Sequence, residues 1–226
     1  MTRIVNNCVA LVCLCLFWGQ SLRAADASHS EQIKWGNESV FNEEHNTLGL
    51  FSGVLGGQIV LAGGTSDDYS RWGRNAVCLS ENAGFALYED VLSKPLAYGA
   101  SITLSDGILC IGGRDSSQCY EDVFFVTMQQ GKLNVSEDWP PLPFPLSNAA
   151  GALLDNKVYL FGGRKSVSPS RLSDSFFVLD LSNKSRGWKE LPGYPGCVRE
   201  DAILVVQNNG CLLYTSPSPR DTERSR

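Results

Sequence analysis

Three glycine doublets recur at nearly constant spacing and constrain the fold more than any other feature of this sequence. They close the segments QIVLAGG, GILCIGG and KVYLFGG at Gly63-Gly64, Gly112-Gly113 and Gly162-Gly163, which lie 49 and 50 residues apart. Each is preceded by an apolar stretch, a tight turn and a second apolar stretch, with the turns at Gly56-Gly57, Asp106-Gly107 and Asp155-Asn156. This pattern predicts strands at 59–63, 108–112 and 158–162, each paired with the strand just before it.

The sequence after each doublet also repeats. A polar loop leads to another apolar strand, at 76–79, 123–126 and 176–179. Two repeats then reach a tryptophan, Trp139 and Trp188, 49 residues apart, and Tyr88 takes this place in the first repeat. We expect the tryptophan to lie on an outer strand and to bury its ring between neighbouring repeats.

Four strands in about 50 residues, with a glycine doublet and a late tryptophan, are typical of a kelch blade in a β-propeller. The sequence therefore predicts an all-β, kelch-type β-propeller over residues 33–210, incomplete, with about three and a half of an expected six blades. The predicted repeats span about 47–95, 96–145 and 146–194, and a fourth starts at 195–210.

The two ends of the chain differ from the repeats. Residues 1–25 carry Arg3, an uncharged apolar run and then small residues, which predicts a secretory signal cleaved between Ala24 and Ala27; a short membrane anchor is the alternative. We therefore expect a secreted or periplasmic protein. The stretch CLLYTSPSPRD in residues 211–226 resembles a translated sequencing adapter, with a natural Ser/Pro-rich tail as the alternative. We expect this tail to take no part in a blade.

Composition excludes several classes of function. The formal net charge of −5 gives no indication of a nucleic-acid surface, and we expect no membrane partner beyond the signal peptide. The two histidines, His29 and His45, precede the repeats, which disfavours a His-based metal site, a catalytic triad or a copper oxidase. We expect no metal and no cofactor.

The repeats contain four cysteines, Cys78, Cys110, Cys119 and Cys197. Their spacing leaves the disulfide pairing open, and Cys110 is expected in the core.

Four stretches resemble the cyclically permuted branch of the kelch mutarotase and N-acetylneuraminate (sialic acid) epimerase family. They are LFSGVLGGQIVLAGG, KPLAYGASITLSDGILCIGG, PLPFPLSNAAGALLDNKVYLFGG and PGCVRED. The resemblance implies a six-bladed exported propeller that interconverts sialic acid anomers through ring opening. Such chemistry needs an acid/base to move protons and a cation to hold the sugar carboxylate.

The resemblance also implies where the site lies. The proposed acid/base of the family is a glutamate directly after a blade glycine, followed by an arginine. The matching positions here hold Thr65, Arg114 and Arg164, so the catalytic residues of this chain are unknown. We expect the substrate-binding residues at the entrance of the inner strands and on the rim of the channel: Tyr98, Asn148, Arg199, Arg114 and Arg164.

Each candidate also has a structural interpretation. Arg199 could pair with the neighbouring Glu200 and Asp201, Tyr98 could be a core aromatic residue, and Asn148 could only end a turn.

Two functions remain open. The first is a propeller acting on an anionic sugar, as a sialic acid mutarotase or epimerase in the full-length protein, with these 226 residues inactive alone. The second is a non-catalytic kelch propeller that binds a protein or glycan.

Overall fold

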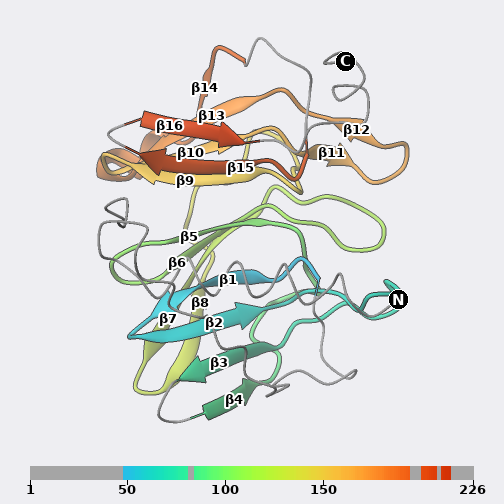
Figure 1. Ribbon diagram of the computed structural model, residues 1–226, viewed down its shortest axis with the longest axis vertical. Helices are drawn as coiled ribbons and strands as arrows, with labels where there is room; N and C mark the ends of the chain where they lie inside the picture. Colours follow the sequence, from blue (N-terminus) through green and yellow to red (C-terminus); the bar gives the residue numbers. More distant parts are fainter. Residues whose placement is uncertain (1–47, 81–83, 194–199, 208–209, 215–226) are drawn as a thin grey trace, which may run out of the picture. The chain divides into compact units, whose positions relative to one another are not determined.

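The structure is a computed structural model that describes residues 48–80, 84–193, 200–207 and 210–214. All of these lie in one compact unit, 41–226. Their main elements are three four-stranded antiparallel sheets, each formed by consecutive segments of the chain (Figure 1). We call these sheets blades 1, 2 and 3. The all-β kelch-blade architecture predicted from the sequence is confirmed.

The twelve blade strands follow the repeats closely. Blade 1 contains β1 (Phe51–Leu55), β2 (Gln58–Ala62), β3 (Ala76–Ser80) and β4 (Gly84–Tyr88). Blade 2 contains β5 (Ala100–Thr103), β6 (Ile108–Ile111), β7 (Val123–Gln129) and β8 (Lys132–Ser136). Blade 3 contains β9 (Ala150–Leu154), β10 (Lys157–Phe161), β13 (Phe176–Asp180) and β14 (Lys189–Leu191). The three strands predicted before the doublets are therefore β2, β6 and β10, and each pairs with the strand before it.

Two of the predicted hairpin turns use left-handed backbone. Gly56 and Gly57 have φ of 55° and 78°, and Asp155 and Asn156 have φ of 49° and 57°. Such angles match the twist of a two-residue hairpin, and glycine, asparagine and aspartate are the residues that adopt them most readily. In blade 2 the turn is closed by Leu104 N, which donates to Gly107 O at 2.8 Å.

The glycine doublets end the second strand of a blade where the backbone of the next repeat passes close by. A Cβ atom on Gly63 would lie 2.2 Å from Leu96 O, and one on Gly112 would lie 2.2 Å from Leu146 O. In these two doublets the next glycine donates its N–H to the same carbonyl, at 2.9 Å from Gly64 and 2.8 Å from Gly113. Glycine is therefore needed there for both close approach and left-handed φ.

The core lies between neighbouring blades and explains the continuous apolar strands. In β6, Ile108 and Cys110 belong to the cluster between blades 1 and 2, whereas Leu109 and Ile111 belong to the cluster between blades 2 and 3. All four side chains are buried because both faces of this strand are covered. The prediction that Cys110 is a core residue is confirmed, since its exposure is 1%.

The late aromatic residues lie between blades, but the expected strand position of the tryptophans is wrong. Trp139 follows β8 and Trp188 precedes β14, in segments without strand pairing. Both rings pack against the second core cluster, and Trp188 Nε1 donates to Pro140 O at 3.0 Å. Tyr88, at the end of β4, likewise reaches the next blade and donates its hydroxyl to Gly131 O. The rings are large enough to fill the space between blades from flanking loops.

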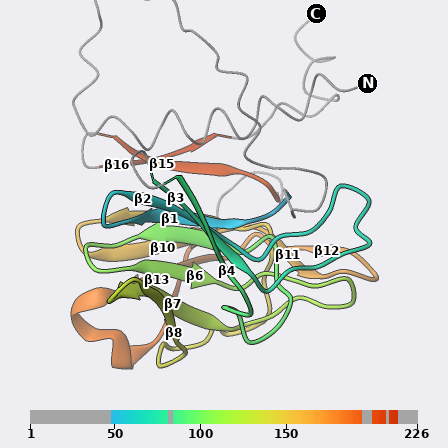
Figure 2. The same cartoon turned by 90° about the horizontal axis from the view of Figure 1, so that it is seen from below.

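Blade 3 carries two additions at opposite ends of its strands. A small hairpin, β11 (Arg164–Ser166) and β12 (Arg171–Leu172), follows its doublet, and a 3₁₀ helix, η1 (Leu181–Arg186), precedes β14. Figures 1 and 2 show the hairpin projecting on one side of the sheets and η1 on the other. Among the described residues, no helix is long and apolar enough to cross a membrane.

A further hairpin follows blade 3 and includes the first residues of the tail. Strand β15 (Ile203–Gln207) lies alongside β9 and pairs with β16 (Gly210–Tyr214). The expectation that the tail takes no part in a blade stays a prediction: residues 211–214 lie in β16 of this separate two-stranded sheet, where Leu213 is the partner of Leu204. An apolar stretch directly after a turn satisfies its backbone groups on the preceding strand, whatever its origin. The remaining tail, 215–226, lies outside the described residues.

The cysteines that the structure describes are free. Cys78, Cys110 and Cys119 are buried and Cys211 is half-buried, whereas Cys197 lies outside the described residues. Burial raises the pKa of the Cys78 thiol to about 11, and it also raises that of Cys110. These thiols are therefore protonated and poorly reactive at neutral pH.

Candidate ligand site at the entrance of the inner strands

The entrance of the inner strands is built on a repeating backbone position. Four residues that precede consecutive inner strands have left-handed φ between 55° and 65°: Gly49, Tyr98, Asn148 and Asp201. Hydrogen bonds join them in series, from Tyr98 N to Gly49 O at 2.7 Å, from Asn148 N to Tyr98 O at 2.7 Å and from Asp201 N to Asn148 O at 3.1 Å. We call this end of the blades the entrance. Tyr98 and Asn148 thus occupy equivalent positions in adjacent blades.

The fourth equivalent position belongs to Asp201. Arg199 was expected at this entrance, and it lies outside the described residues. Asp201 carries the left-handed φ of 55° and the backbone bond to Asn148, so its backbone continues the series. The fourth repeat contains no glycine doublet that would fix its alignment with the other repeats. Sequence spacing alone therefore did not identify Asp201 as the equivalent residue.

The residue after each doublet is fixed beside the entrance. Short antiparallel bridges pair Thr65 with Leu48, Arg114 with Ala97 and Arg164 with Ser147. The bond from Arg114 N to Ala97 O and that from Arg164 N to Ser147 O are both 2.7 Å long. The residue after each doublet therefore lies at an equivalent backbone position in its blade, and these positions hold one threonine and two arginines.

Arg114 is surrounded by aromatic rings. Its guanidinium carbon lies 4.6 Å from the ring centroid of Tyr98, 5.1 Å from that of Trp72 and 5.9 Å from that of Tyr69. Its Nη1 donates to Asp115 O at 3.4 Å, and its buried Nε has no hydrogen-bond partner in the part of the chain that the structure describes. Arg114 is in none of the ion pairs found among the described residues. The cation is thus held by ring faces and is not neutralised by an acid.

Tyr69 and Trp72 were missed by the sequence analysis. They come from the loop after the first doublet, where Trp72 Nε1 donates to Tyr69 O at 3.1 Å. Asp68 holds this loop, because its Oδ1 accepts from Ser66 Oγ at 2.6 Å and from Ser70 N at 3.0 Å. These hydrogen bonds, the one from Ser66 first, lower the pKa of Asp68 to about 2. The signal in the sequence that could have identified Tyr69 and Trp72 is an aromatic pair inside an otherwise polar loop.

Tyr98 is part of this aromatic group, and it is absent from the two core clusters. Its hydroxyl donates to the Tyr69 hydroxyl at 3.4 Å, and its ring lies over Gly49, where a Cβ atom would come within 2.8 Å of Tyr98 Cγ. Burial is the main cause that raises the pKa of the Tyr98 phenol, followed by the bond to Tyr69. The phenol therefore stays neutral at physiological pH.

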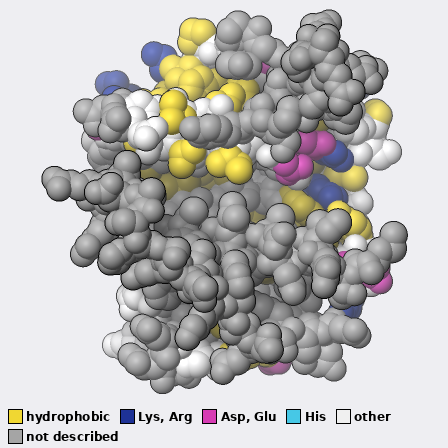
Figure 3. Space-filling view, in the orientation of Figure 1, with side chains coloured by type: hydrophobic (Ala, Val, Ile, Leu, Met, Phe, Trp, Pro, Cys, Tyr) yellow, Lys and Arg dark blue, Asp and Glu magenta, His cyan; other side chains and the backbone are white. Residues whose placement is uncertain are grey.

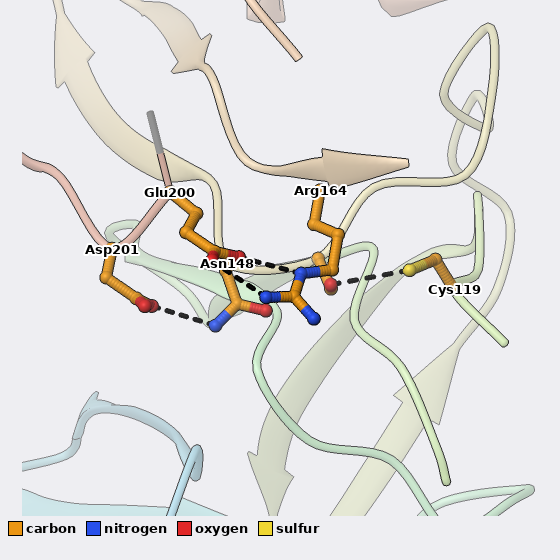
Figure 4. Close-up of polar contacts among 6 residues, drawn as sticks. Cys119, Asn148, Arg164, Glu200 and Asp201 are labelled. Atoms are coloured by element: carbon orange, nitrogen blue, oxygen red, sulfur yellow. Dashed lines mark hydrogen bonds and ion pairs between the residues drawn. The ribbon is translucent and has the colours of Figure 1, made fainter. Parts of the chain in front are cut away.

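Arg164 has the opposite environment from Arg114. Its Nε and Nη2 donate to the two carboxylate oxygens of Glu200, each at 2.7 Å (Figure 4). This pairing raises the pKa of Arg164, and both side chains are about a quarter exposed, at 24% and 25%. Asn148 lies beside this pair and donates Nδ2 to Asp201 Oδ1 at 2.8 Å. The sequence analysis considered Glu200 and Asp201 only as partners of Arg199.

The charged residues of the entrance therefore fall into two groups. One is Arg114 among aromatic rings, and the other is Arg164 with Glu200, next to Asn148 and Asp201. Figure 3 shows acidic and basic side chains next to each other in the region of β11, with hydrophobic side chains over the β15–β16 region. There, Ile203 and Val205 are 61% and 43% exposed. Within the described residues, no group of three His, Cys, Asp or Glu side chains is arranged to hold a metal ion.

A separate groove lies at the other end of the strands. Its volume is about 650 Å³, and the turns between β5 and β6 and between β9 and β10 contribute to its walls. Trp139 also lines it, with Lys184 Nζ 4.0 Å from the ring centroid. None of the entrance residues lines this groove, so it is independent of the candidate site.

Comparisons with known proteins agree with the fold. The family model described as Kelch motif matches residues 145–192, which covers blade 3. A solved chain titled "Structure of YjhT" superposes with a TM-score of 0.60 at 12% identity, over 73% of this chain and 60% of that chain, which supports the fold alone. The kelch β-propeller assignment made from the glycine doublets is thereby confirmed.

Curated relatives match shorter stretches. N-acetylneuraminate epimerase of Vibrio cholerae serotype O1 is 30% identical over 95 residues, which is 42% of this chain and 23% of that protein. N-acetylneuraminate epimerase of Yersinia pestis (strain Pestoides F) is 32% identical over 71 residues, 31% of this chain and 16% of that protein. A Kelch domain-containing protein of Vibrio cholerae is 30% identical over 76 residues, 34% of this chain and 19% of that protein. The matched stretches span less than a quarter of these relatives.

Proposed function

We propose that this kelch-repeat chain belongs to an exported propeller that binds an anionic sugar at the entrance of its inner strands, and that the whole protein interconverts the anomers of a sialic acid. The single observation that carries the proposal is the environment of Arg114. Its half-buried guanidinium faces three aromatic rings and is not paired with an acid in the described part of the chain. The relatives named N-acetylneuraminate epimerase support the choice of sugar.

A carboxylate is the ligand group that fits Arg114 best. The buried Nε–H has no partner among the described residues, and a carboxylate oxygen accepting from it would form a charge-assisted hydrogen bond. Such a bond contributes more than a neutral one, about 1.5–3 kcal/mol. The formal net charge of the chain is −5, so the attraction for an anion is local to this guanidinium and does not come from the protein as a whole.

The aromatic side chains complement the rest of a sugar. Tyr69 is 50% exposed, and the rings of Tyr69 and Tyr98 are stacked with their centroids 6.5 Å apart. Aromatic faces pack against the apolar C–H faces of pyranose rings, while hydroxyl groups at the ring edge reach polar partners. The site thus combines a cation, ring faces and, around Asn148 and Arg164, several hydrogen-bonding groups.

Anomer exchange requires two proton movements. A base removes the proton of the anomeric hydroxyl while an acid protonates the ring oxygen; the C–O bond of the ring breaks, and closure on the other face of the ketone gives the other anomer. None of the three residues after the doublets is a carboxylate, because they are Thr65, Arg114 and Arg164. We therefore assign binding to the described residues and leave the acid/base unassigned.

Binding is tested by ligand-observed NMR on the 226-residue chain with N-acetylneuraminate. We expect saturation transfer to the sugar, and Arg114→Gln should weaken binding by about 10-fold or more, since roughly 1.4 kcal/mol corresponds to tenfold. Arg186→Gln is the matched control, because Arg186 lies in η1, at the other end of the strands from the entrance. Absence of binding, or equal loss in both variants, would contradict the proposal.

Turnover separates the two candidate functions. We expect no anomer exchange above the buffer rate from these residues alone, because no described residue supplies the expected glutamate. A protein with all blades should accelerate the exchange. If the complete protein binds the sugar without accelerating exchange, the chain belongs to a non-catalytic glycan-binding propeller.

A further inference from the structure

Two buried side-chain atoms of the described residues have no hydrogen-bond partner, and both lie at the entrance. One is Arg114 Nε, a donor, and the other is Asn148 Oδ1, an acceptor. Buried polar atoms are nearly always paired in native proteins, so each unpaired one needs an explanation, such as an ordered water or a ligand group that binds there. The proposed function uses Arg114. Asn148 Oδ1 points to a second polar contact on the next blade.

The orientation of the Asn148 carboxamide is fixed by Asp201. An ionised carboxylate only accepts hydrogen bonds, so the group that faces Asp201 Oδ1 at 2.8 Å must be the Nδ2 amide. The oxygen is then directed away from Asp201. Figure 4 shows the carboxamide between Asp201 and the guanidinium of Arg164, with its oxygen on the Arg164 side.

Arg164 offers donors on the same side. Glu200 accepts from Nε and Nη2, which leaves Nη1 without a hydrogen bond among the described residues. The backbone bridge between Ser147 and Arg164 keeps this guanidinium next to Asn148. An acceptor and a donor are thereby placed together. A hydroxyl group is the simplest ligand group that donates and accepts at once.

We propose that Asn148 and Arg164 form a subsite for a hydroxyl group of the bound sugar, distinct from the anion contact at Arg114. The hydroxyl donates to Asn148 Oδ1 and accepts from Arg164, while Asp201 and Glu200 are positioning residues that hold these two side chains. This inference rests on the proposed function. It adds that the site selects a polyhydroxylated acid over a simple carboxylate.

The test compares two ligands on the 226-residue chain: N-acetylneuraminate, and benzoate as a carboxylate that has a ring and no hydroxyl group. Asn148→Gly removes the carboxamide without straining the backbone, because Gly49 occupies the equivalent left-handed position. One neutral hydrogen bond contributes about 0.5–1.5 kcal/mol, so binding of N-acetylneuraminate should weaken by roughly 2- to 10-fold. Benzoate binding should stay within about twofold, whereas Arg114→Gln weakens both.

The matched control is Asn156→Gly. Asn156 also has left-handed φ, of 57°, but lies in the β9–β10 turn at the other end of the strands. The Asn156→Gly variant should bind N-acetylneuraminate and benzoate with unchanged affinity. The positioning role of Asp201 is tested with Asp201→Asn, whose amide no longer dictates which way Asn148 faces. If Asp201 acts through Asn148, the double variant binds N-acetylneuraminate no more weakly than Asn148→Gly alone.

The outcomes separate the two proposals. Unchanged N-acetylneuraminate binding in Asn148→Gly, or an equal loss for both ligands, overturns the hydroxyl subsite while the anion site at Arg114 stands. Additive losses in the double variant overturn the positioning role of Asp201. If the unaltered chain binds neither ligand, the proposed function fails and the subsite fails with it.

Discussion

The residues after the three doublets occupy the same backbone position but have three different environments. Thr65 is fully buried and donates to Arg71 O at 2.7 Å, so it closes its own loop. Arg114 is held by ring faces without an acid, and Arg164 is held by the carboxylate of Glu200. The doublet therefore fixes where a side chain lies, and neighbouring loops decide what it can do. Within the described residues, Thr65 of blade 1 bonds to its own loop, Arg114 of blade 2 has no acidic partner, and Arg164 of blade 3 is paired with Glu200.

The largest expected effect comes from the backbone that the three positions share. Gly112→Ala would place a Cβ atom 2.2 Å from Leu146 O at a φ of 62°. The backbone would have to move, and we expect a loss of about 3 kcal/mol or more in the free energy of unfolding, from strain and overpacking together. Urea denaturation followed by tryptophan fluorescence measures this loss.

Gly56→Ala separates close approach from backbone conformation. Gly56 has a similar φ of 55°, but nothing lies within 4 Å of its Cβ position. We expect a loss of about 1 kcal/mol, the cost of a left-handed conformation alone. If the two variants lost equal stability, crowding at the doublet would not be the reason for its glycine.

The strands and the entrance differ in how far the sequence predicted them. Ile108, Leu109 and Cys110 are all buried, in alternating core clusters, and the apolar pattern and turn residues predicted the strands before the doublets to within one residue. Tyr98 and Asn148 followed from the repeat. Their partners did not, because Tyr69 is 29 residues from Tyr98, and Asp201 is 53 residues from Asn148. Such contacts depend on how loops of different blades meet.

The second expected effect distinguishes the two arginines. Arg164→Gln leaves Glu200 without its partner in a half-buried place, and we expect a loss of about 1.5–3 kcal/mol in the free energy of unfolding. Arg114→Gln removes cation–π contacts, about 0.5–1 kcal/mol, and the long hydrogen bond to Asp115 O at 3.4 Å. Denaturant unfolding of both variants checks this order. The double variant of Arg164→Gln with Glu200→Gln should recover part of the loss, and a greater loss would show that Glu200 is stabilised by other groups.

A smaller effect is expected at Thr65. Thr65→Val keeps the shape of the side chain and removes the hydrogen bond to Arg71 O, which should cost about 1 kcal/mol. Sugar binding should change only if this bond also holds Tyr69 and Trp72 in place. Thr127→Val on β7 is the control, since no side-chain hydrogen bond of Thr127 is found among the described residues. Equal stability of the two variants would show that the Thr65 bond contributes nothing measurable.

The smallest expected effect concerns the pKa values of two aspartates, one in the loop after the doublet of blade 1 and one in the corresponding loop of blade 2. Asp68 and Asp115 hold equivalent loops, and the pKa of each is lowered to about 2. For Asp115, burial raises the pKa, but hydrogen bonds from the Tyr120 hydroxyl, at 2.6 Å, and from Ser117 outweigh it. Because the folded pKa lies below the unfolded one, this contribution to stability is present above roughly pH 4 and is lost as the pH falls towards about 2. Tyr120→Phe should therefore raise the pKa of Asp115 and leave that of Asp68 unchanged, as measured by NMR titration of the carboxyl carbons. Equal shifts in both residues would mean that the two loops titrate together, and no shift in either would show that the Tyr120 bond does not stabilise the carboxylate.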